Sequence, residues 1–571
     1  MQYNVFGKIY AIRKEYTQVI YYKRFVDEKF DEKGHLSEYK LKEGVEFNFA
    51  YDHIDYVAER EPDRLAIMYV NDKGFEKSIT YKEWSEKSDA LASFLLSVGI
   101  RKGDRVMLVL KRHFEFWYSY AALHKIGAIA IPATYQLQDK DYIYRFNAAG
   151  VSAIIAANDP QVIQHIENAE KATDTLKCKI LCRGEREGWL SFDKGIENAA
   201  PFKKPTGEDM PKSSDRMLIF FTSGTNGMPK MAAHNFLYPL AHIFTGVYWH
   251  RVIDGGLHIT VADTGWAKTG WGKMYGQLMG GSAQLVYDHE KFNAADMLEM
   301  LQKYKPTTFC APPTIYRFLI KEDLKKYDLS SIKNAAIAGE ALNPEVFNQF
   351  KEATGLKLME GFGQSESSVI VCTPYYTEPK VGSMGLPVPY LDVDVVDDQG
   401  RSTAPGENGE IVIRKRDGKH PAGLLIEYYR DPESTAKVWE GGYYHTGDIA
   451  WRDEDGYYWY VGRKDDVIKS SGYRIGPFEV ESVIMEHPAV LECAVTGVPH
   501  EIRGMVVKAT IVLTKGYQPS DELAKEIQNY VKTHTAPYKY PRIVEFVDEL
   551  PKTSSGKIKR VDIRNKDFTN K

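Results

Sequence analysis

The sequence predicts an α/β protein with a large N-terminal domain of βαβ-type parallel sheets, a β-rich subdomain and a small α+β domain at the C-terminus. Two observations lead to this fold class. From about residue 63, short apolar runs alternate with longer amphipathic runs, which is typical of βαβ units and a largely parallel sheet. From about residue 388, apolar residues alternate with polar ones, as they do in antiparallel strands with one buried face.

The expected elements of the N-terminal half follow from the spacing of apolar residues. Residues 65–70 are expected to form a strand. A helix is expected to begin at Thr80, because Glu83 stands at the position that completes a capping box. Further along, strands are expected over 106–110, 128–131 and 151–157, and a helix over 114–126.

The C-terminal half is expected to contain antiparallel strands and then a separate unit. Strands are expected over 389–400 and 409–414, and a hairpin over 451–462 with its turn at Asp455-Gly456. The final segment should hold helices over 477–486 and 521–534 and strands near 494 and over 506–513. At roughly 100 residues, this segment has the usual size of a small domain. We therefore expect domains over 1–464 and 465–571.

Composition excludes several classes of protein. The chain has 571 residues, with 74 Lys and Arg against 78 Asp and Glu, so its formal net charge is −4. This charge argues against a dedicated binder of nucleic acid or of anionic membranes. The five cysteines lack metal-ligand spacing and are expected to be reduced thiols. The sequence shows no apolar stretch of membrane-spanning length, and residues 1–31 lack the apolar core of a secretory signal, so a cytoplasmic protein is expected.

The strongest local signal lies between Met217 and Lys230, where an apolar strand runs into a loop of hydroxyl residues and glycines that is closed by a lysine. Glycines let the backbone approach a ligand closely, so that amide N–H groups can converge on phosphate oxygens. The spacing is not that of a Walker A loop, because no Gly-Lys-Ser/Thr follows at the required distance. The loop therefore indicates phosphate binding of a kind different from that of P-loop kinases and ATPases.

The loop Thr222-Ser-Gly-Thr-Asn-Gly-Met-Pro-Lys230 resembles the phosphate-binding loop of the acyl-adenylate-forming superfamily, which includes acyl-CoA synthetases, adenylation domains and luciferases. Seven more segments are similar to motifs of that superfamily and follow in the same order. They are Asp263-Thr-Gly-Trp266, Ala338-Gly-Glu-Ala341, Gly361-Phe-Gly-Gln-Ser-Glu366, Tyr444-His-Thr-Gly-Asp448, Gly462-Arg-Lys-Asp-Asp466, Ser471-Gly-Tyr-Arg-Ile475 and Pro551-Lys-Thr-Ser-Ser-Gly-Lys557. The resemblance covers nearly the whole chain from about residue 47, and the Asp263-Thr-Gly-Trp266 segment looks most like medium-chain acyl-CoA synthetases.

The resemblance implies an ATP site. Asp448 would accept hydrogen bonds from both ribose hydroxyls, and Glu366 would hold Mg²⁺ together with phosphate oxygens. Ser365, before this glutamate, keeps the hydroxyl of the threonine that is usual in the superfamily and is expected to share its catalytic role. The other implied nucleotide contacts are Thr222, Ser223, Gly224, Thr225, Asn226, Gly227 and Lys230 at the phosphates, Gly339, Glu340 and Ala341 at the adenine, and Gln364 and Arg463.

Lys557 is the expected catalytic residue of the first step. In the superfamily, a carboxylate attacks the α-phosphorus of ATP and expels pyrophosphate, and an ammonium between the two anions offsets their repulsion. The small domain is mobile there and turns at the position that matches Asp465, so that the thiol of coenzyme A can replace the lysine. The implied coenzyme A contacts are Ser471, Gly472, Tyr473 and Arg474. Without the motifs, Lys557 would be interpreted as a surface lysine and 463–466 as an ordinary charged linker.

Three residues bear on the size of the acid. Acetate-specific relatives carry a tryptophan at the position that aligns with Gly363, so the glycine predicts an acid larger than acetate. Trp271 could cap the same acyl pocket from another side or could pack in the core, and the sequence supports both alternatives equally. Together with Trp266, these residues favour short-to-medium-chain acids, including branched and aryl-substituted ones.

The resemblance thus implies an AMP-forming acyl-CoA synthetase that uses ATP, Mg²⁺ and coenzyme A and acts on a small carboxylic acid. Nucleic acid and a membrane span are not expected, and the oligomeric state stays open, a homodimer being one alternative. Two rival functions are an enzyme that loads an acid onto a carrier-protein thiol and a non-catalytic sensor of nucleotide or acid. A hydrolase is disfavoured, because the segment from Gly363 to Ser367 lacks the second glycine of a nucleophile elbow.

Overall fold

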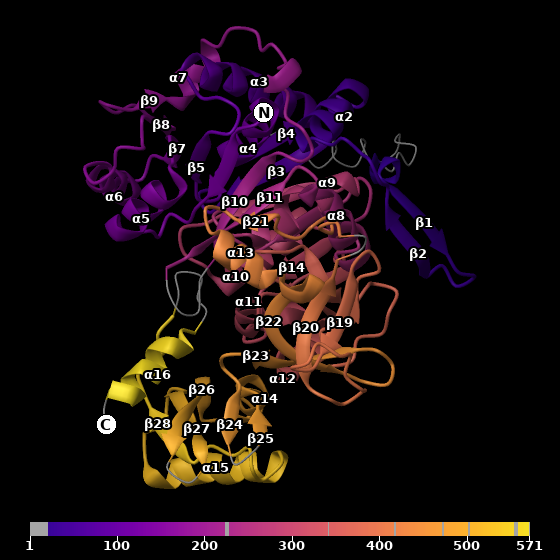
Figure 1. Cartoon of the computed structure of the whole chain (residues 1–571), viewed down its shortest axis with the longest axis vertical. Coiled ribbons are helices and arrows are strands. Elements are labelled where there is room, and N and C mark those ends of the chain that lie inside the picture. Colours follow the sequence, from indigo (N-terminus) through magenta and orange to yellow (C-terminus); the bar gives the residue numbers. More distant parts are fainter. Residues whose placement is uncertain are drawn as a thin grey trace.

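The computed structural model describes residues 21–222, 228–340, 342–415, 418–470, 473–500, 503–552 and 558–569. It confirms the predicted α/β class. The described residues form two large, mostly parallel sheets, a four-stranded antiparallel sheet and a five-stranded sheet near the C-terminus, besides a two-stranded ribbon near the N-terminus. Figure 1 shows the two large sheets in the upper part of the molecule and the yellow C-terminal elements at the lower end.

The first large sheet has the strand order β21-β11-β10-β6-β5-β7-β8-β9. Its pairs from β10 to β9 are parallel, whereas β11 and β21 are antiparallel additions at one edge. Its strands are β5 (Arg105–Val109), β6 (Ile129–Pro132), β7 (Ala153–Ala157), β8 (Cys178–Cys182), β9 (Leu190–Ser191), β10 (Arg216–Thr222), β11 (Lys230–Asn235) and β21 (Glu427–Tyr428). Every residue of β6 and β7 is buried, as expected of parallel strands that are covered on both faces.

The second large sheet has the order β18-β17-β16-β15-β14-β12-β13-β3-β4 and is parallel from β16 to β3. Its strands are β3 (Leu65–Asn71), β4 (Glu76–Thr80), β12 (Leu257–Thr260), β13 (Ala283–Asp288), β14 (Thr308–Ala311), β15 (Asn334–Ala338), β16 (Leu358–Gly363), β17 (Val369–Cys372) and β18 (Leu386–Pro387). The strand predicted over 65–70 is confirmed as β3, which pairs with the neighbouring strand β4 on one side and with β13, far away in sequence, on the other.

Helices connect these strands. They include α3 (Tyr81–Ser97), α4 (Glu115–Ile126), α5 (Asp139–Ala149), α6 (Pro160–Glu170), α7 (Phe192–Glu197), α8 (Tyr238–Phe244), α10 (Ala294–Tyr304), α11 (Pro313–Leu319) and α12 (Pro344–Thr354). The predicted start of α3 is confirmed, since the hydroxyl of Thr80 accepts a hydrogen bond from the backbone N–H of Glu83 at 3.1 Å. The reciprocal half of the capping box is replaced by other contacts: the Glu83 carboxylate accepts from Tyr118 and pairs with Lys77.

The β-rich subdomain is the antiparallel sheet β19 (Asp392–Val396), β20 (Gly409–Arg414), β22 (Tyr443–Arg452) and β23 (Tyr458–Arg463). The C-terminal sheet then begins with β24 (Ile468–Ser470) and continues with β25 (Tyr473–Ile475), β26 (Val490–His500), β27 (Gly504–Leu513) and β28 (Ile543–Phe546). Its helices are α14 (Pro477–Ile484), α15 (Asp521–His534) and α16 (Arg560–Thr569). Because one sheet ends at Arg463 and the next begins at Ile468, we propose to keep the domain boundary at 464/465.

Two smaller expectations can be compared with the structure. All five cysteines are free thiols, four of them buried. In the part of the chain that the structure describes, we find no helix with the length and the apolar character that a bilayer crossing requires.

Candidate active site

A partly buried hydrogen-bond cluster joins the β-rich subdomain to the end of β16. The carboxylate of Asp448 accepts from Nε2 of Gln364 at 2.6 Å, from Nη1 of Arg463 at 3.2 Å and from the hydroxyl of Tyr460 at 3.1 Å. Gln364 is itself fixed by the hydroxyl of Tyr444, which donates to its Oε1 at 2.7 Å. The structure thus brings together three of the predicted nucleotide contacts, and it holds the Asp448 carboxylate in one orientation.

Glu366 lies directly after this cluster and faces the edge of the first sheet. The hydroxyl of Tyr428, in β21, donates to its Oε1 at 3.1 Å. Burial raises the pKa of Glu366, while hydrogen bonds from Tyr428 and Thr222 act in the opposite direction. The backbone carbonyl of Ser365 lies 2.9 Å from Nε2 of His234. Glu366 therefore lies beside Thr222, where the predicted phosphate loop begins.

The chemistry of these side chains fits Mg²⁺ that arrives with a nucleotide. Mg²⁺ in nucleotide sites takes one or two protein carboxylates, with phosphate oxygens and waters completing its shell. A bound cation would favour the ionised form of Glu366 and so offset the effect of burial. Within the described parts of the chain, no three His, Cys, Asp or Glu side chains gather into a cluster that would hold a metal ion without such a ligand.

The first and last residues of the predicted phosphate loop lie in paired strands. Thr222, the last residue of β10, lies opposite Lys230, the first residue of β11, in the antiparallel pairing of these strands. The ammonium of Lys230 lies 4.9 Å from the ring centroid of Tyr428, the residue that contacts Glu366. The predicted loop residues Ser223, Gly224, Thr225, Asn226 and Gly227 lie outside the described residues.

The segment predicted to bind adenine follows β15. Gly339 has a φ of +109°, a left-handed conformation that favours glycine, and a Cβ atom there would meet nothing within 4 Å among the described residues. Glu340 points its carboxylate toward Thr314 and Arg317, with Nη2 of Arg317 3.5 Å from its Oε2. Ala341 lies outside the described residues. The backbone at Gly339 thus faces open space among the described residues.

Sequence reasoning missed Glu360, which lies in β16 beside this segment. Its Oε1 accepts from the backbone N–H of Leu342 at 3.3 Å, and its Oε2 has no hydrogen-bond partner among the described residues. Burial raises the pKa of Glu360 to about 8. An acidic residue inside an apolar strand, as in Leu358-Met-Glu360, was a signal that could have identified it, because buried carboxylates with raised pKa values cluster at functional sites.

Two of the three predicted acyl-pocket residues, Trp271 and Gly363, are in direct contact. A Cβ atom on Gly363 would lie 2.6 Å from Cζ2 of Trp271 and closer still to Cη2. Nε1 of Trp271 donates to the carbonyl of Ser367 at 3.0 Å, and the indole is 7% exposed. Trp266 lies half-buried in the turn that follows β12. The ring of Trp271 therefore packs in the core and also covers Gly363, and its place in the acyl pocket stays a prediction.

The predicted C-terminal residues are described only in part. Ser471, Gly472 and Lys557 lie outside the described residues, and of Arg474 only the backbone is described, paired with Lys469 between β24 and β25. Tyr473 is 50% exposed and its ring stacks on that of Tyr538 with a centroid distance of 4.0 Å. On either side of the segment that contains Lys557, Lys552 and Ile558 form an antiparallel bridge.

Asp465 lies where the chain passes from β23 to the C-terminal sheet. Its carboxylate lies 3.8 Å from Nε of Arg463, which also binds Asp448. From the other side, Arg564 in α16 donates to the backbone carbonyl of Asp465 at 3.4 Å and pairs with Asp466. The predicted hinge is thus linked by Arg463 to Asp448 and by Arg564 to the last helix.

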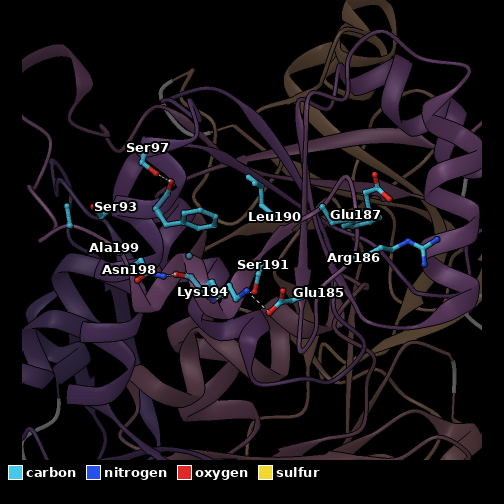
Figure 2. A pocket seen from close by; sticks show the side chains of 14 residues that line it. Ser93, Ser97, Glu185, Arg186, Glu187, Leu190, Ser191, Lys194, Asn198 and Ala199 are labelled. Atoms are coloured by element: carbon cyan, nitrogen blue, oxygen red, sulfur yellow. Dashed lines mark hydrogen bonds and ion pairs between the residues drawn. The ribbon is translucent and has the colours of Figure 1, made fainter.

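A surface hollow of about 850 Å³ lies elsewhere, between α3, α7 and the segment before β9. Figure 2 shows the side chains that line it, with an ion pair between Lys194 and Glu185. None of the predicted site residues is among them. We therefore place the candidate site at the ends of β10, β15 and β16 and not in this hollow.

Comparison with known proteins identifies the family. The model of the AMP-binding enzyme family matches residues 54–418, and that of the AMP-binding enzyme C-terminal domain matches residues 479–557. The chain belongs to the AMP-binding enzyme family. It is 40% identical to acyl-coenzyme A synthetase ACSM4, mitochondrial, of Homo sapiens and 41% identical to ACSM5, mitochondrial, of the same species; each comparison covers 91% of both chains.

Solved structures of AMP-binding enzymes have the same fold. An anthranilate CoA ligase in complex with anthranoyl-AMP superposes with a TM-score of 0.81 at 28% identity, covering 90% of this chain and 97% of that one. A benzoate CoA ligase from Burkholderia xenovorans superposes with a TM-score of 0.78 at 27% identity, covering 91% and 100%. The resemblance inferred from the eight motifs is thereby confirmed.

These relatives correct one expectation. Both human synthetases carry the word mitochondrial in their names, so the prediction of a cytoplasmic AMP-binding enzyme is contradicted. The prediction was based on missing apolar segments. Apolar segments indicate membrane spans and secretory signals, whereas mitochondrial targeting segments are amphipathic. The absence of apolar segments therefore does not distinguish a cytoplasmic from a mitochondrial protein.

Proposed function

We propose that this AMP-binding enzyme is an AMP-forming acyl-CoA synthetase, an acid–thiol ligase. A carboxylate and ATP give acyl-AMP and pyrophosphate, and coenzyme A then gives acyl-CoA and AMP. The observation that carries the proposal is the similarity to acyl-coenzyme A synthetases over 91% of both chains, together with the cluster of Asp448, Gln364 and Arg463 beside Glu366. No described feature favours loading of a carrier-protein thiol or a sensor over this reaction.

In the first step, the described residues would bind and orient ATP. The Asp448 carboxylate, oriented by Gln364, Tyr460 and Arg463, would accept hydrogen bonds from the ribose hydroxyls. Glu360 would hydrogen-bond the adenine through Oε2, which has no partner among the described residues. Thr222 and Lys230 would hold the phosphates at the two ends of the loop. Mg²⁺, when bound at Glu366, would neutralise charge on the phosphate oxygens.

Lys557 would supply the cation between the carboxylate and the α-phosphate. Charge that develops in a closed site of low dielectric is stabilised strongly by such a group. The small domain would then turn at Asp465, so that Gly472 and its neighbours admit the pantetheine thiol. The exposed, stacked rings of Tyr473 and Tyr538 lie next to that segment and would offer an aromatic surface to the rest of coenzyme A.

The proposed substrate is a short-to-medium-chain or aryl carboxylic acid. Trp271 covers Gly363 and would close the acyl pocket, which supports a limit on acid length. The test is a panel of carboxylic acids, scored by pyrophosphate release with and without coenzyme A. Acid-dependent release of pyrophosphate and a CoA thioester are expected. Release that leads to a thioester only with a phosphopantetheinylated carrier protein would favour the carrier-loading alternative, and no release with any acid would favour the sensor.

A further inference from the structure

Arg145 is an arginine in α5 whose charge is not paired with a carboxylate. It is 8% exposed, and among the described residues its guanidinium makes no hydrogen bond and no ion pair within 4 Å. Asp141, one turn earlier in the same helix, acts on Arg145 through its charge alone. The guanidinium nitrogens are not fully enclosed, so the small exposed fraction of the residue includes its charged end.

Other buried arginines of the protein have carboxylate partners. Arg64 pairs with Glu61 at 2.9 Å, and Arg183 pairs with Glu115 at 2.7 Å. Burial lowers the pKa of each of these two arginines, but the carboxylates more than offset this effect and the pKa is raised. In Arg145 the effect of burial prevails and lowers the pKa from 12.5 to about 10. Arg145 is therefore a cation at neutral pH that the described protein does not neutralise.

The side chains of Tyr144 and Arg145 contact both ends of the predicted phosphate loop. The guanidinium carbon of Arg145 lies 4.5 Å from the ring centroid of Phe221, the last residue but one of β10. The hydroxyl of Tyr144 donates to the carbonyl oxygen of Pro229, directly before β11, at 2.8 Å. The ring of Tyr144 also meets that of Phe221 edge-on, with a centroid distance of 6.2 Å. Two consecutive residues of α5 thus contact the chain where the loop begins and where it ends.

A polyphosphate is the anion that suits this position. Charged groups in protein interiors are normally paired, so an unpaired cation favours the binding of an anion. The attraction acts without direct contact, and it is screened less near a buried group than in water. Binding of phosphate by backbone amides also requires that the amides be held in a fixed arrangement. Contacts at both ends of a loop contribute to such an arrangement.

We propose that Tyr144 and Arg145 are positioning residues of the ATP site, which hold the two ends of the phosphate loop while the charge of Arg145 is balanced by the polyphosphate. This inference rests on the proposed function, because it concerns the ATP site of the same enzyme. It assigns both residues to the first step, in which pyrophosphate is bound and released. The phosphates of coenzyme A have the same chemistry but enter in the second step, so the two steps distinguish the two sources.

The test compares the two half-reactions. Acid-dependent exchange of pyrophosphate into ATP gives the KM for ATP, for pyrophosphate and for the acid. Thioester formation from supplied acyl-AMP gives the KM for coenzyme A. The variants are Arg145→Met, Arg145→Lys and Tyr144→Phe. The matched controls are Lys140→Met, which removes an exposed cation of the same helix, and Tyr142→Phe, which removes a hydroxyl of that helix that has no partner among the described residues.

Arg145→Met should raise the KM for ATP and for pyrophosphate about tenfold and leave the KM for the acid and the second half-reaction unchanged. Arg145→Lys should recover most of this loss, because it keeps the charge. Tyr144→Phe should raise the same two constants about threefold, as expected for one neutral hydrogen bond. Both controls should behave as the wild type.

Three results would overturn the inference and leave the proposed function intact. They are an unchanged KM for ATP in Tyr144→Phe and Arg145→Met, an equal loss of both half-reactions, and a rise confined to the KM for coenzyme A. If Arg145→Met did not fold, Arg145→Lys and Tyr144→Phe would decide, and an unchanged KM for ATP in Tyr144→Phe would then count against the inference. Absence of acid-dependent exchange in the wild type would overturn the proposed function as well.

Discussion

The indole of Trp271 lies over the Cα atom of Gly363, at a distance that leaves no room for a Cβ atom on that glycine. The ring is held there by its Nε1, which donates to the carbonyl oxygen of Ser367 at 3.0 Å. A single large ring therefore fills this space, and it comes from position 271 rather than from position 363. The size of the acid that fits should depend on the two positions as a pair.

Trp271→Ala should shift activity toward longer acids, because removal of the indole opens the space beside Gly363. Gly363→Trp alone should be inactive or unfolded, since two indoles would overlap. The double variant Gly363→Trp/Trp271→Ala should regain activity with short acids. Pyrophosphate release is measured with acids of increasing chain length for each variant. Trp189→Ala is the control, because Trp189 is a buried tryptophan outside the site. An unchanged profile in Trp271→Ala would show that this ring is only part of the core.

Lys557→Ala should abolish formation of acyl-AMP and leave the second step intact, because only the first step brings a carboxylate against the α-phosphate. The measurement is acid-dependent pyrophosphate release, compared with thioester formation from supplied acyl-AMP. Lys552→Ala is the matched control, since Lys552 lies in the same segment and pairs with Glu492 at 2.7 Å. Equal loss of both steps in Lys557→Ala would refute the division of roles.

Gly472→Leu should have the opposite effect, because a side chain at this position would obstruct the pantetheine thiol. Acid-dependent exchange of pyrophosphate into ATP should persist while acyl-CoA formation is lost. Lys469→Leu, on the neighbouring exposed position of β24, should affect neither reaction. Normal overall turnover of Gly472→Leu would remove this glycine from the coenzyme A site.

Asp448→Asn should raise the KM for ATP by roughly tenfold to a hundredfold, because it weakens charge-assisted hydrogen bonds to ribose. The KM for the acid should stay the same. Asp453→Asn is the control, since Asp453 lies at the turn of the same hairpin and pairs with Lys380 at 2.6 Å. If the KM for ATP changed equally in both variants, a general loss of stability would account for the effect.

Lys273 predicts a pH dependence of stability. It is 3% exposed, and burial together with the charge of Arg112 lowers its pKa from 10.5 to about 7. Between these two pKa values, Lys273 is neutral in the folded chain but protonated in the unfolded chain. The unfolded chain therefore binds more protons, and the free energy of unfolding should rise with pH from about 7 to 10. Lys273→Met should flatten this rise, and Lys171→Met, at an exposed position, should not. Urea unfolding at several pH values measures how the free energy of unfolding changes with pH. The same pH dependence in the wild type and in Lys273→Met would contradict the prediction.

Elements with strong local signals could be predicted from the sequence. The helix expected over 521–534 coincides with α15, because its amphipathic spacing and its serine cap are local features. The pairing of β3 with β13 could not be predicted, since it depends on contacts between segments far apart in sequence. For the same reason, the sequence left open whether Trp271 lies in the core or in the pocket.

The site residues also divide into those that sequence motifs predict and those that only the structure reveals. The motifs predicted Asp448, Gln364 and Glu366, and the structure brings them together. Glu360 was missed although an acidic residue inside an apolar strand is a signal, because only the structure shows that its Oε2 is buried without a partner among the described residues. Sequence shows that such residues exist but not what surrounds them.

The most direct test of the central claim follows the oxygen atoms of the acid. The enzyme is incubated with ATP, coenzyme A and a carboxylic acid whose carboxylate carries heavy oxygen, and the nucleotide product is analysed by mass spectrometry. Attack of the carboxylate on the α-phosphorus, followed by thioester formation, predicts AMP that carries one labelled oxygen. Formation of ADP, or of AMP without label, would contradict the account.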